Sequence, residues 1–417
     1  MCGIAGWIAR AEAAPDPEFL AAMNRTQAHR GPDGEGVFSA TTRSGRHRVA
    51  LGHRRLAIID LATGDQPMYD ASGRLAVVFN GEIYNFLDLR RELEGAGYRF
   101  RTSSDTEVLL HGWRAWGERM VERLRGMFAF ALWDADTERL LLARDPFGKK
   151  PLYLHEAEGR VAFASEVKAL LALPGVAVAA DAGAVWNYLL YRYVPGPATL
   201  FRGVSKLPPG TYALWRDGRF ESRRYYLPPD LTLLPGTAVP SDAVAGFLAR
   251  LDQAVRIRMV SDVPYGAFLS GGIDSSAVVA LMARHSARPV VTFSVGFREA
   301  RFSELAHARA IAAQFKTEHH ELEIEADHLV DELPKLIRFR DAPVAEPSDI
   351  PIYLLSRRAS ERVKMVLTGE GSDEILAGYP KHAFEPLVAA YQAVVPAGLH
   401  RSLIEPLIDA LPFAFRR

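Results

Sequence analysis

Hydrophobic and polar positions follow two different patterns in the two halves of the chain. Up to about Gly218, short alternating or continuous apolar runs separated by turns predict strands, and helical spacing interrupts them three times. The expected strands cover residues 48–60, 74–80, 126–134, 140–145, 161–165 and 210–215, and the expected helices cover 19–29, 86–95 and 106–116. This pattern predicts a sheet-rich α+β domain built in layers.

The second half alternates strands with helices after a proline-rich segment at 227–240. The expected strands are 290–295 and 364–368, and the expected helices are 241–260, 274–284, 303–314 and 352–362. Alternation of this kind indicates βαβ units and a parallel sheet. We therefore expect a first domain at 2–218, a linker at 219–240 and a second, α/β domain at 241–417.

Composition argues against several classes of function. Lys plus Arg and Asp plus Glu each total 50 of the 417 residues, so no charge bias favours nucleic acid or an anionic membrane surface. No apolar run is long enough to span a bilayer, and the N-terminus lacks the features of a signal peptide. A single cysteine cannot form an internal disulfide and suits a reducing compartment. These features predict a cytoplasmic enzyme without a nucleic-acid or membrane partner.

The single cysteine, Cys2, directly follows the initiator methionine. If Met1 is removed, the thiol belongs to the first residue, and its own α-amine can act as general base because it titrates near roughly 7.7–8.0. A lone cysteine more often fills a core, but a chain terminus is seldom packed. Gly3 and Gly6 are expected to leave space for a ligand. Cys2 is therefore the candidate nucleophile.

Polar clusters in the first half supply the groups that an amide-cleaving nucleophile needs. They are HRGPD at 29–33, GHRRLAIID at 52–60, NGEIYN at 80–85 and SSDTE at 103–107. Arg55 offers a fork for a carboxylate, and Glu82 and Asp105 could hold an ammonium group. Asn80 and the amide of Gly81 could stabilise an oxyanion. By themselves, NGE also fits a hairpin turn, and an aspartate before a helix also fits an N-cap.

Together with Cys2, these clusters resemble the class II glutamine amidotransferases, whose amidase domain belongs to the N-terminal nucleophile hydrolases. The resemblance extends to about residue 218 and includes RDPFGKKPLY at 144–153 and KLPPG at 206–210. It implies a four-layer αββα sandwich in which Cys2 attacks the side-chain amide of glutamine. It also implies that glutamine is bound by Arg55, Leu56, Ala57, Ile58, Ile59, Asn80, Gly81, Glu82 and Asp105.

The second half carries LSGGIDSS at 269–276, between an apolar run and a helical pattern. Small residues after a strand let backbone amides surround an anion, and no lysine follows the glycines as it would in a Walker A loop. A turn with helix-capping residues is the alternative for the loop alone. The loop resembles that of the ATP pyrophosphatase family, which cleaves ATP between the α and β phosphates. The resemblance implies that Ser270, Gly271, Gly272, Asp274, Ser275 and Ser276 hold pyrophosphate, with Asp274 also a Mg²⁺ ligand.

A second Gly-rich acidic turn follows the expected strand at 364–368, in VLTGEGSDEILAGY at 366–379. The carboxyl end of a parallel strand faces the ligand crevice of such a sheet. The two-domain order resembles the glutamine-dependent asparagine synthetases, a family whose substrates are glutamine, ATP and aspartate. This resemblance implies roles for Thr368 and Gly369 in nucleotide contact, Glu370 in catalysis, Asp373 in binding Mg²⁺ and pyrophosphate, and Leu269 and Val295 beside adenine.

We therefore expect glutamine hydrolysis at Cys2, internal transfer of ammonia, and ATP-dependent adenylation and amidation of aspartate with release of AMP and diphosphate. Two alternatives stay open: an amidotransferase for another carboxylate, such as a sugar or peptide precursor, and a glutaminase or binding protein with an inactive second domain. A β-lactam-forming relative is disfavoured because that branch does not use a Cys2 amidase. A homodimer is compatible with this interpretation.

Three features depart from the resemblance or stay outside it. DAPVAEP at 341–347 has Ala342 where the family often has an acidic residue, which bears on acceptor recognition. Family synthetase domains continue well past GEGSDE, so we expect the second domain to be incomplete. The first domain has its own sheet patterns and glutamine-binding clusters up to about residue 218, so we expect it to hydrolyse glutamine unaided. His319 and His320 have no partner at metal-ligand spacing, so we expect a strand edge there and not a zinc site.

Overall fold

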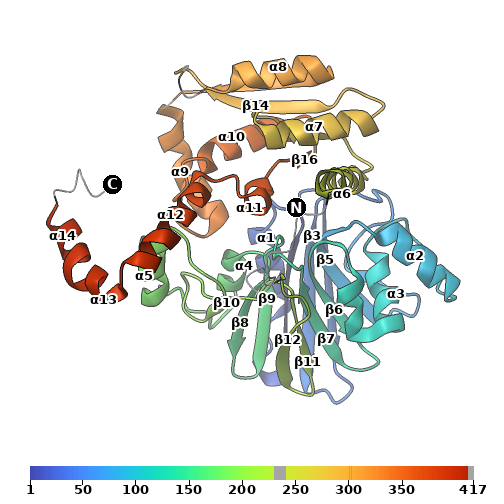
Figure 1. The fold of residues 1–417 in the computed structure, drawn as a ribbon. Coiled ribbons are helices and arrows are strands. Elements are labelled where there is room, and N and C mark those ends of the chain that lie inside the picture. Colours follow the sequence, from blue (N-terminus) through green and yellow to red (C-terminus); the bar gives the residue numbers. More distant parts are fainter. Residues whose placement is uncertain (230–240, 300, 302, 326, 412–417) are drawn as a thin grey trace.

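The computed structural model of the protein describes residues 1–229, 241–299, 301, 303–325 and 327–411. It contains two domains, with the first in the lower part and the second in the upper part of Figure 1. Residues 230–240 of the expected linker, and residues 412–417, lie outside this description. Within the described residues, no helix is both long and apolar enough to cross a membrane.

Two antiparallel sheets of six strands each form the middle of the first domain. The strand order is β10-β8-β9-β1-β3-β2 in one sheet and β12-β11-β7-β6-β5-β4 in the other. The strands are β1 (Gly3–Arg10), β2 (Gly34–Thr41), β3 (His47–Arg55), β4 (Met68–Tyr69), β5 (Leu75–Ile83), β6 (Gly126–Asp134), β7 (Arg139–Arg144), β8 (Tyr153–Ala157), β9 (Arg160–Ala164), β10 (Val204–Lys206), β11 (Thr211–Arg216) and β12 (Arg219–Arg224).

Helices cover the outer face of each sheet and complete the expected αββα sandwich. In β1, Ile4 and Ile8 pack between the sheets, whereas Ala5 and Trp7 pack with α1 and α4, so both faces of the strand are buried. On the other sheet, α2 and α3 cover the face that carries Phe79. The helices of this domain are η1 (Ala11–Ala13), α1 (Pro17–Thr26), α2 (Phe86–Gly95), α3 (Glu107–Trp116), η2 (Gly117–Arg123), α4 (Val167–Leu171) and α5 (Ala182–Tyr191).

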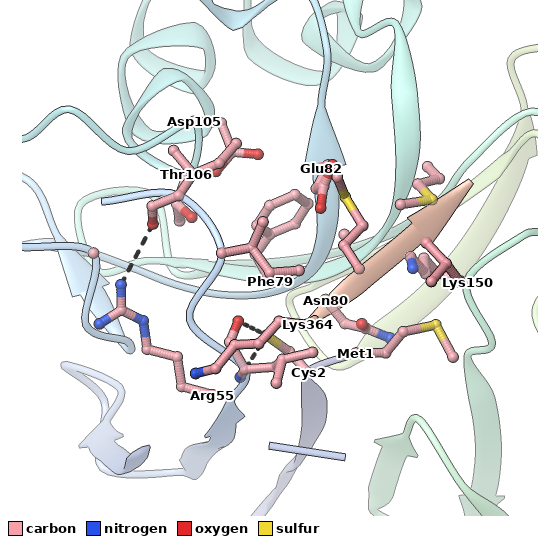
Figure 2. A pocket seen from close by; sticks show the side chains of 18 of the residues that line it. Met1, Cys2, Arg55, Phe79, Asn80, Glu82, Asp105, Thr106, Lys150 and Lys364 are labelled. Atoms are coloured by element: carbon pink, nitrogen blue, oxygen red, sulfur yellow. Dashed lines mark hydrogen bonds between the residues drawn. The ribbon is translucent and has the colours of Figure 1, made fainter. Parts of the chain in front are cut away.

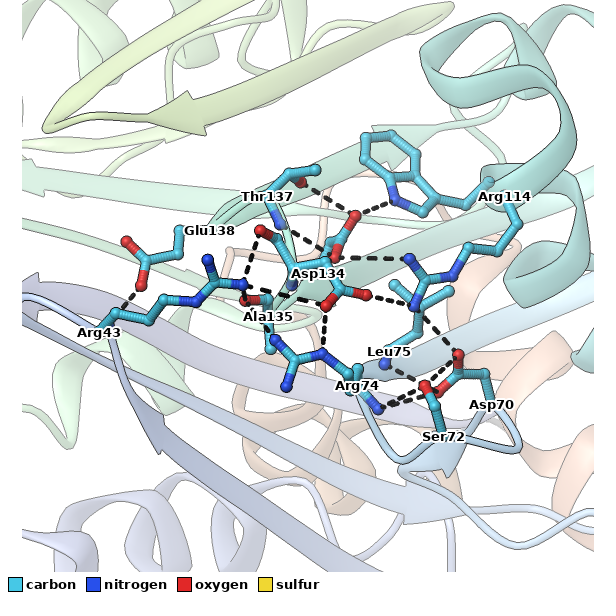
Figure 3. A network of polar contacts seen from close by, with 12 residues as sticks. Arg43, Asp70, Ser72, Arg74, Leu75, Arg114, Asp134, Ala135, Thr137 and Glu138 are labelled. Atoms are coloured by element: carbon cyan, nitrogen blue, oxygen red, sulfur yellow. Dashed lines mark hydrogen bonds and ion pairs between the residues drawn. The ribbon is translucent and has the colours of Figure 1, made fainter.

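A network of charged side chains fixes α3 against its sheet (Figure 3). Arg114 of α3 contacts Asp70 at 3.1 Å and Asp136 at 2.9 Å, and Trp113 donates to Asp134 Oδ2 at 2.8 Å. The network lies at the end of β5 and β6 that is opposite to Asn80 and Glu82, because Leu75 pairs with Asp134 and Glu82 with Met127. Anchoring α3 in this way positions the residues just before it, including Asp105.

Two predicted boundaries of the first domain change in the structure. β12 pairs with β11 along its whole length, so the domain continues beyond the expected end at Gly218. β3 ends at Arg55, although we expected a strand to Asp60. Residues 56–60 leave the sheet because the amide of Ala57 donates to Asp33 Oδ2 at 2.9 Å and that of Asp60 to Asp262 Oδ2 at 2.7 Å.

The second domain is built on the predicted parallel sheet, with strand order β15-β14-β13-β16. Val279 of α7 and Ala308 of α8 pack on one face, and Leu355 of α10 packs against Phe293 on the other. His319 and His320 lie in the edge strand β15, as expected. The strands are β13 (Tyr265–Phe268), β14 (Val291–Phe297), β15 (Glu318–Ile324) and β16 (Met365–Leu367). The helices are α6 (Ala243–Arg258), α7 (Ile273–His285), α8 (Leu305–Phe315), α9 (Asp327–Arg340), α10 (Asp349–Ser360), α11 (Ser372–Leu376), α12 (Pro380–Val394), α13 (Ala397–Leu399), η5 (His400–Ile404) and α14 (Glu405–Ala410).

Candidate active site

Cys2 lies at the start of β1 in a cavity of about 530 Å³ between the two domains (Figure 2). Pairing of Gly3 with Arg54 brings Cys2 beside the end of β3. Its Sγ accepts a hydrogen bond from the amide of Leu56 at 3.3 Å. Of the residues that we expected to bind glutamine, all but Ala57 line this cavity. The structure therefore brings the predicted nucleophile and the predicted glutamine-binding residues together.

The two glycines beside Cys2 serve packing and not ligand access, so our expectation for them was wrong. A Cβ atom at Gly6 would lie 2.3 Å from the carbonyl oxygen of Ala50 and 2.7 Å from the ring of Phe163. A Cβ atom at Gly3 would lie 3.0 Å from Cβ of Gln27. Both glycines let β1 approach its neighbours closely, and this approach fixes the position of Cys2.

The backbone of Cys2 is held by a charged pair. Arg30 donates from Nε to the carbonyl oxygen of Cys2 at 2.9 Å and pairs with Glu166 Oε1, also at 2.9 Å. Burial alone would raise the pKa of Glu166, but its hydrogen bonds and ion pairs with His29, Arg30 and Lys168 lower it to about 2. Glu166 therefore stays ionised and keeps Arg30 directed at the nucleophile.

The thiol and the chain terminus both lie in a desolvated environment. Burial raises the pKa of Cys2, against the lowering effect of the Leu56 amide. Burial also lowers the pKa of the Met1 α-amino group to about 5. Met1 lines the cavity, and while it is present the nitrogen of Cys2 is an amide that cannot accept a proton. Removal of Met1 is thus the step that would give Cys2 a base.

Arg55 reaches the cavity with its guanidinium already occupied by groups of its own chain. It is 7% exposed, and Nη1 contacts Asp65 Oδ1 at 2.8 Å and the carbonyl oxygen of Leu61 at 3.3 Å. The side chain of Asp65 is 85% exposed. A ligand carboxylate could replace such an exposed partner at little cost, since ion pairs in water are weak.

Asn80 and Glu82 project from the end of β5, which excludes the hairpin-turn alternative for NGE. The side chain of Asn80 is fully buried, and its Nδ2 and Oδ1 are both without a hydrogen-bond partner among the described residues. Buried amides normally find partners, so this orphaned amide points to a missing ligand. It fits the predicted oxyanion role.

Two buried carboxyl groups lie where an ammonium group was predicted. Burial, and then the charge of Asp105, raises the pKa of Glu82 to about 7. Burial also raises the pKa of Asp105 to about 6, although its Oδ2 accepts a hydrogen bond from the Ile83 amide at 2.9 Å. Asp105 precedes the N-cap residue Thr106, so it is not itself the N-cap of α3. A bound cation would favour ionisation of both groups.

Several residues of the cavity were not predicted from sequence. Lys150 is 5% exposed and lines the cavity, and burial lowers its pKa to about 8. It belongs to RDPFGKKPLY, a motif that we recognised without giving this lysine a role. The second domain contributes part of the wall through Phe268, Ser356, Ala359, Ser360, Val363, Lys364, Met365 and Val366. No local sequence signal could identify these residues, since they reach the cavity only when the domains dock.

The predicted nucleotide loop connects β13 to α7. Ser275 Oγ accepts a hydrogen bond from the Ser270 amide at 3.2 Å and lies 3.0 Å from Ser270 Oγ, so the loop is curled on itself. Gly271 has a φ of +86°, and a Cβ atom there would lie 2.6 Å from the amide nitrogen of Ala308. Ser276 Oγ is buried without a partner in the described part of the chain. The compact turn and the orphaned hydroxyl fit an anion site at the start of α7.

The second predicted loop meets the first one at Gly369. This glycine follows β16, and a Cβ atom there would lie 2.8 Å from the amide nitrogen of Ser275 and 2.9 Å from Cβ of Asp274. Asp274 and Asp373 lie in the first turns of α7 and α11. The carboxyl ends of β13 and β16 thus bring most of the predicted ATP residues to one edge of the sheet. Thr368 and Glu370 are exposed in the same second loop.

The other predicted nucleotide contacts are less direct. Leu269 is 1% exposed and packs in the core beneath the loop, and Val295 is half-buried in β14. Among the described residues, no group of three or more His, Cys, Asp or Glu side chains is arranged to hold a metal ion. Mg²⁺ binds through few carboxylates together with substrate phosphates, so Asp274 and Asp373 would have to share it with ATP.

Known proteins match both domains of the chain. Residues 1–226 match the glutamine amidotransferase domain family, and residues 246–416 match the asparagine synthase family. A putative asparagine synthetase (glutamine-hydrolyzing) of Mycobacterium tuberculosis is 40% identical, and the match covers 97% of this chain and 64% of that protein. Asparagine synthetase (glutamine-hydrolyzing) 1 of Bacillus subtilis is 38% identical, with 97% and 63% covered.

A shorter archaeal relative is matched over more of its length. A putative asparagine synthetase (glutamine-hydrolyzing) 2 of Methanocaldococcus jannaschii is 33% identical, with 92% of this chain and 76% of that protein covered. The chain therefore spans from 63% to 76% of the length of these three curated relatives. These matches agree with the site geometry in both domains, and the chain belongs to the family of glutamine-hydrolysing asparagine synthetases.

Proposed function

We propose that the chain transfers ammonia from glutamine to an activated carboxylate, with aspartate as the acceptor and asparagine as the product. The observation that carries the proposal is the cavity that Cys2 shares with Phe268 and Val366 of the second domain. Phe268 directly precedes the predicted ATP loop, and Val366 lies two residues before Thr368. Ammonia formed at Cys2 would therefore have a route toward both nucleotide loops.

The first half-reaction starts when the α-amine of Cys2, free after removal of Met1, takes the thiol proton. The sulfur attacks the amide carbon of glutamine, and Asn80 Nδ2 and the Gly81 amide are the donors for the oxyanion. Return of the proton to the leaving nitrogen releases ammonia and leaves a γ-glutamyl thioester. Water then hydrolyses the thioester to glutamate and restores the thiol.

The remaining site residues hold the charged end of glutamine. Its α-carboxylate would replace Asp65 on the fork of Arg55, which is preorganised by its contacts with the following segment. Its α-ammonium would be held by Glu82 and Asp105, whose burial makes an ionised pair unfavourable until a cation is present. Leu56, Ala57, Ile58 and Ile59 would shape the pocket mainly through their backbone.

In the second half-reaction, the phosphates of ATP would lie on the loop at 270–276, at the start of α7. Mg²⁺, held by Asp274 and Asp373, would neutralise phosphate charge. Glu370 would support adenylation and receive a proton from the attacking ammonia. The aspartate carboxylate attacks the α-phosphate with loss of pyrophosphate, and ammonia then displaces AMP from the acyl-adenylate. We place the reaction in the cytoplasm, and a homodimer stays a prediction.

Product analysis tests this proposal. The chain is incubated with ATP, Mg²⁺ and aspartate, and with either glutamine or ammonium chloride as nitrogen donor. With glutamine as nitrogen donor, we expect glutamate, asparagine, AMP and pyrophosphate in equal amounts. With ammonium as nitrogen donor, we expect asparagine, AMP and pyrophosphate in equal amounts. ADP and phosphate in place of AMP and pyrophosphate would contradict the assignment of the loops. Glutamate without pyrophosphate would favour a glutaminase, and pyrophosphate release with a different carboxylate would favour another acceptor.

A further inference from the structure

The glutamine-binding segment of the first domain is held in part by the second domain. Asp262, in the turn between α6 and β13, accepts a hydrogen bond at Oδ2 from the amide of Asp60 at 2.7 Å. The amide of Asp262 donates to the carbonyl oxygen of Ile58 at 3.0 Å. Two backbone groups at the end of the segment 55–60 thus have their partners on one residue of the other domain.

A second contact reaches the same segment through one intermediate residue. Lys364, which directly precedes β16, donates to Asp33 Oδ2 at 2.7 Å. The same oxygen accepts a hydrogen bond from the amide of Ala57 at 2.9 Å. Burial alone would raise the pKa of Asp33, but the hydrogen bonds from Lys364 and Ala57 lower it, so Asp33 is ionised and binds both groups at neutral pH. Lys364 therefore acts on the middle of the segment.

The two contacts come from residues that precede neighbouring strands of the parallel sheet. Tyr265 of β13 pairs with Met365 of β16, and the amide of Lys364 donates to the carbonyl oxygen of Pro264 at 3.1 Å. Asp262 and Lys364 consequently lie together at the amino ends of the two strands. The carboxyl ends of the same strands carry both predicted nucleotide loops. The glutamine-binding segment thus contacts residues at the amino ends of these two strands, and the predicted nucleotide site lies at their carboxyl ends.

The segment needs such support because it leaves the sheet at Arg55 and pairs with none of the described strands. Leu56 is fixed by the sulfur of Cys2, and its amide would lose that partner during each covalent cycle. The next three residues, 57–59, line or adjoin the pocket, and the contacts described above fix Ala57 and Ile58. A small displacement here would move the backbone that faces glutamine.

We propose that Asp262 and Lys364 are positioning residues of the glutamine site, which hold the segment 55–60 in the conformation that binds glutamine. The inference rests on the proposed function, in that the ligand of this segment is glutamine. Glutamine is then bound tightly only while the second domain is docked against the first. The expectation that the first domain hydrolyses glutamine unaided is revised accordingly, to activity with weaker glutamine binding.

Substitutions in the full chain test the proposal. Lys364→Met and Asp262→Ala remove the two contacts, whereas Lys364→Arg keeps a cation and Asp262→Asn keeps an oxygen acceptor. Matched controls from the second domain are Lys335→Met, whose ammonium pairs with Glu332 at 3.0 Å, and Asp252→Ala, whose carboxylate pairs with His285 at 2.8 Å. Each variant is assayed for the KM and kcat of glutamate formation and for its melting temperature.

We expect the KM for glutamine to rise about three- to tenfold in Lys364→Met and in Asp262→Ala, because each loses one partly exposed polar contact. The kcat should stay within about twofold, since the nucleophile and the oxyanion donors are untouched. Lys364→Arg and Asp262→Asn should lie close to the unmodified chain, and the two controls should match it. A contact that served only stability would lower the melting temperature and leave the KM unchanged.

Calorimetric titration of glutamine into the same variants carrying Cys2→Ala gives a second measurement that requires no turnover. A rise in the dissociation constant that parallels the rise in KM would support the proposal. Unchanged KM and dissociation constant in both removal variants would overturn it, as would an equal rise in the controls. In either case an unmodified chain that still hydrolyses glutamine leaves the proposed function intact. A chain that neither binds nor hydrolyses glutamine would instead overturn both.

Discussion

At the scale of single residues, the thiol of Cys2 is the group on which the glutamine half-reaction depends. Replacing it by Cys2→Ala should lower glutamine hydrolysis by at least about a thousandfold, because no other described group near the site is a comparable nucleophile. Ammonia-dependent formation of AMP should be unchanged, since that half-reaction uses the other domain. The measurement compares glutamate and AMP formation with each nitrogen donor, and glutamate formation that survives the substitution would refute the role of Cys2.

Glu82 makes the binding of glutamine depend on pH. Its pKa is raised to about 7, so the carboxyl group is ionised above that value and protonated below it. Only the ionised form attracts the α-ammonium of glutamine. The KM for glutamine should therefore rise about tenfold as the pH falls from 8 to 6. In Glu82→Gln, the KM should be high at every pH and nearly constant over this interval, and a pH dependence identical to that of the unmodified chain would exclude the role of Glu82.

The roles of single residues could be predicted from the sequence where the residue type and its neighbours in the chain already indicate a chemical function. A cysteine behind the initiator methionine, the Arg55 fork and the NGE segment were all recognised, and the structure brings them to one cavity. The raised pKa values of Glu82 and Asp105 were not predictable, because they arise mainly from burial in the folded chain. The role of Gly6 was misjudged for the same reason, since only close packing against Ala50 and Phe163 explains it.

At the scale of elements, long segments with regular spacing were predicted well. β6 and α2 have the predicted bounds, and α3, β14 and α7 differ from them by one or two residues. β1 was missed because its run of small and apolar residues is buried on both faces and shows no alternation. β15 was expected only as a strand edge at His319 and His320, and its full extent was not predicted because its sequence EHHELEI is charged, as an edge strand allows. The expected strand at 48–60 was too long, because residues 56–60 form their hydrogen bonds with Asp33 and with Asp262 of the second domain and not with a neighbouring strand.

The contact between the two nucleotide loops gives a prediction at this scale. Gly369→Ala should place a methyl group within van der Waals overlap of the backbone of Ser275 and force the loop after β16 away from α7. We expect AMP formation to fall by more than about tenfold, since misplacement by an ångström is costly in catalysis. Glutamine hydrolysis should be retained. Gly398→Ala, where a Cβ atom meets nothing within 4 Å, is the matched control. Unimpaired AMP formation in Gly369→Ala would mean that the two loops do not act together.

At the scale of the whole molecule, a line of charged groups connects the second domain to the nucleophile. Asp341 accepts a hydrogen bond from the amide of Lys168 at 3.0 Å and lies 3.2 Å from its Nζ. Lys168 Nζ contacts Glu166 Oε2 at 2.5 Å, and Glu166 holds Arg30, which donates to the carbonyl oxygen of Cys2. Asp341 opens the DAPVAEP segment that was associated with the acceptor. Sequence analysis could not connect Asp341 to Lys168, because that contact exists only between docked domains.

The central member of this line, Lys168, contacts one carboxylate in each domain, Glu166 and Asp341. The side chain of Lys168 is 19% exposed, and those of Glu166 and Asp341 are 8% and 11% exposed. Lys168→Met would therefore leave a buried negative charge without its cation, and breaking a buried ion pair in this way lowers stability by roughly 3–5 kcal/mol. We expect calorimetry to show a lower melting temperature, or two separate transitions in place of one. Burial already raises the pKa of Asp341, and loss of the lysine cation should raise it further. The loss of stability in Lys168→Met, relative to the unmodified chain, should therefore become smaller as the pH falls and Asp341 takes up a proton. Lys335→Met, which removes an exposed pair within α9, is the control. Equal melting curves for both variants and the unmodified chain would show that the buried pair contributes nothing to docking.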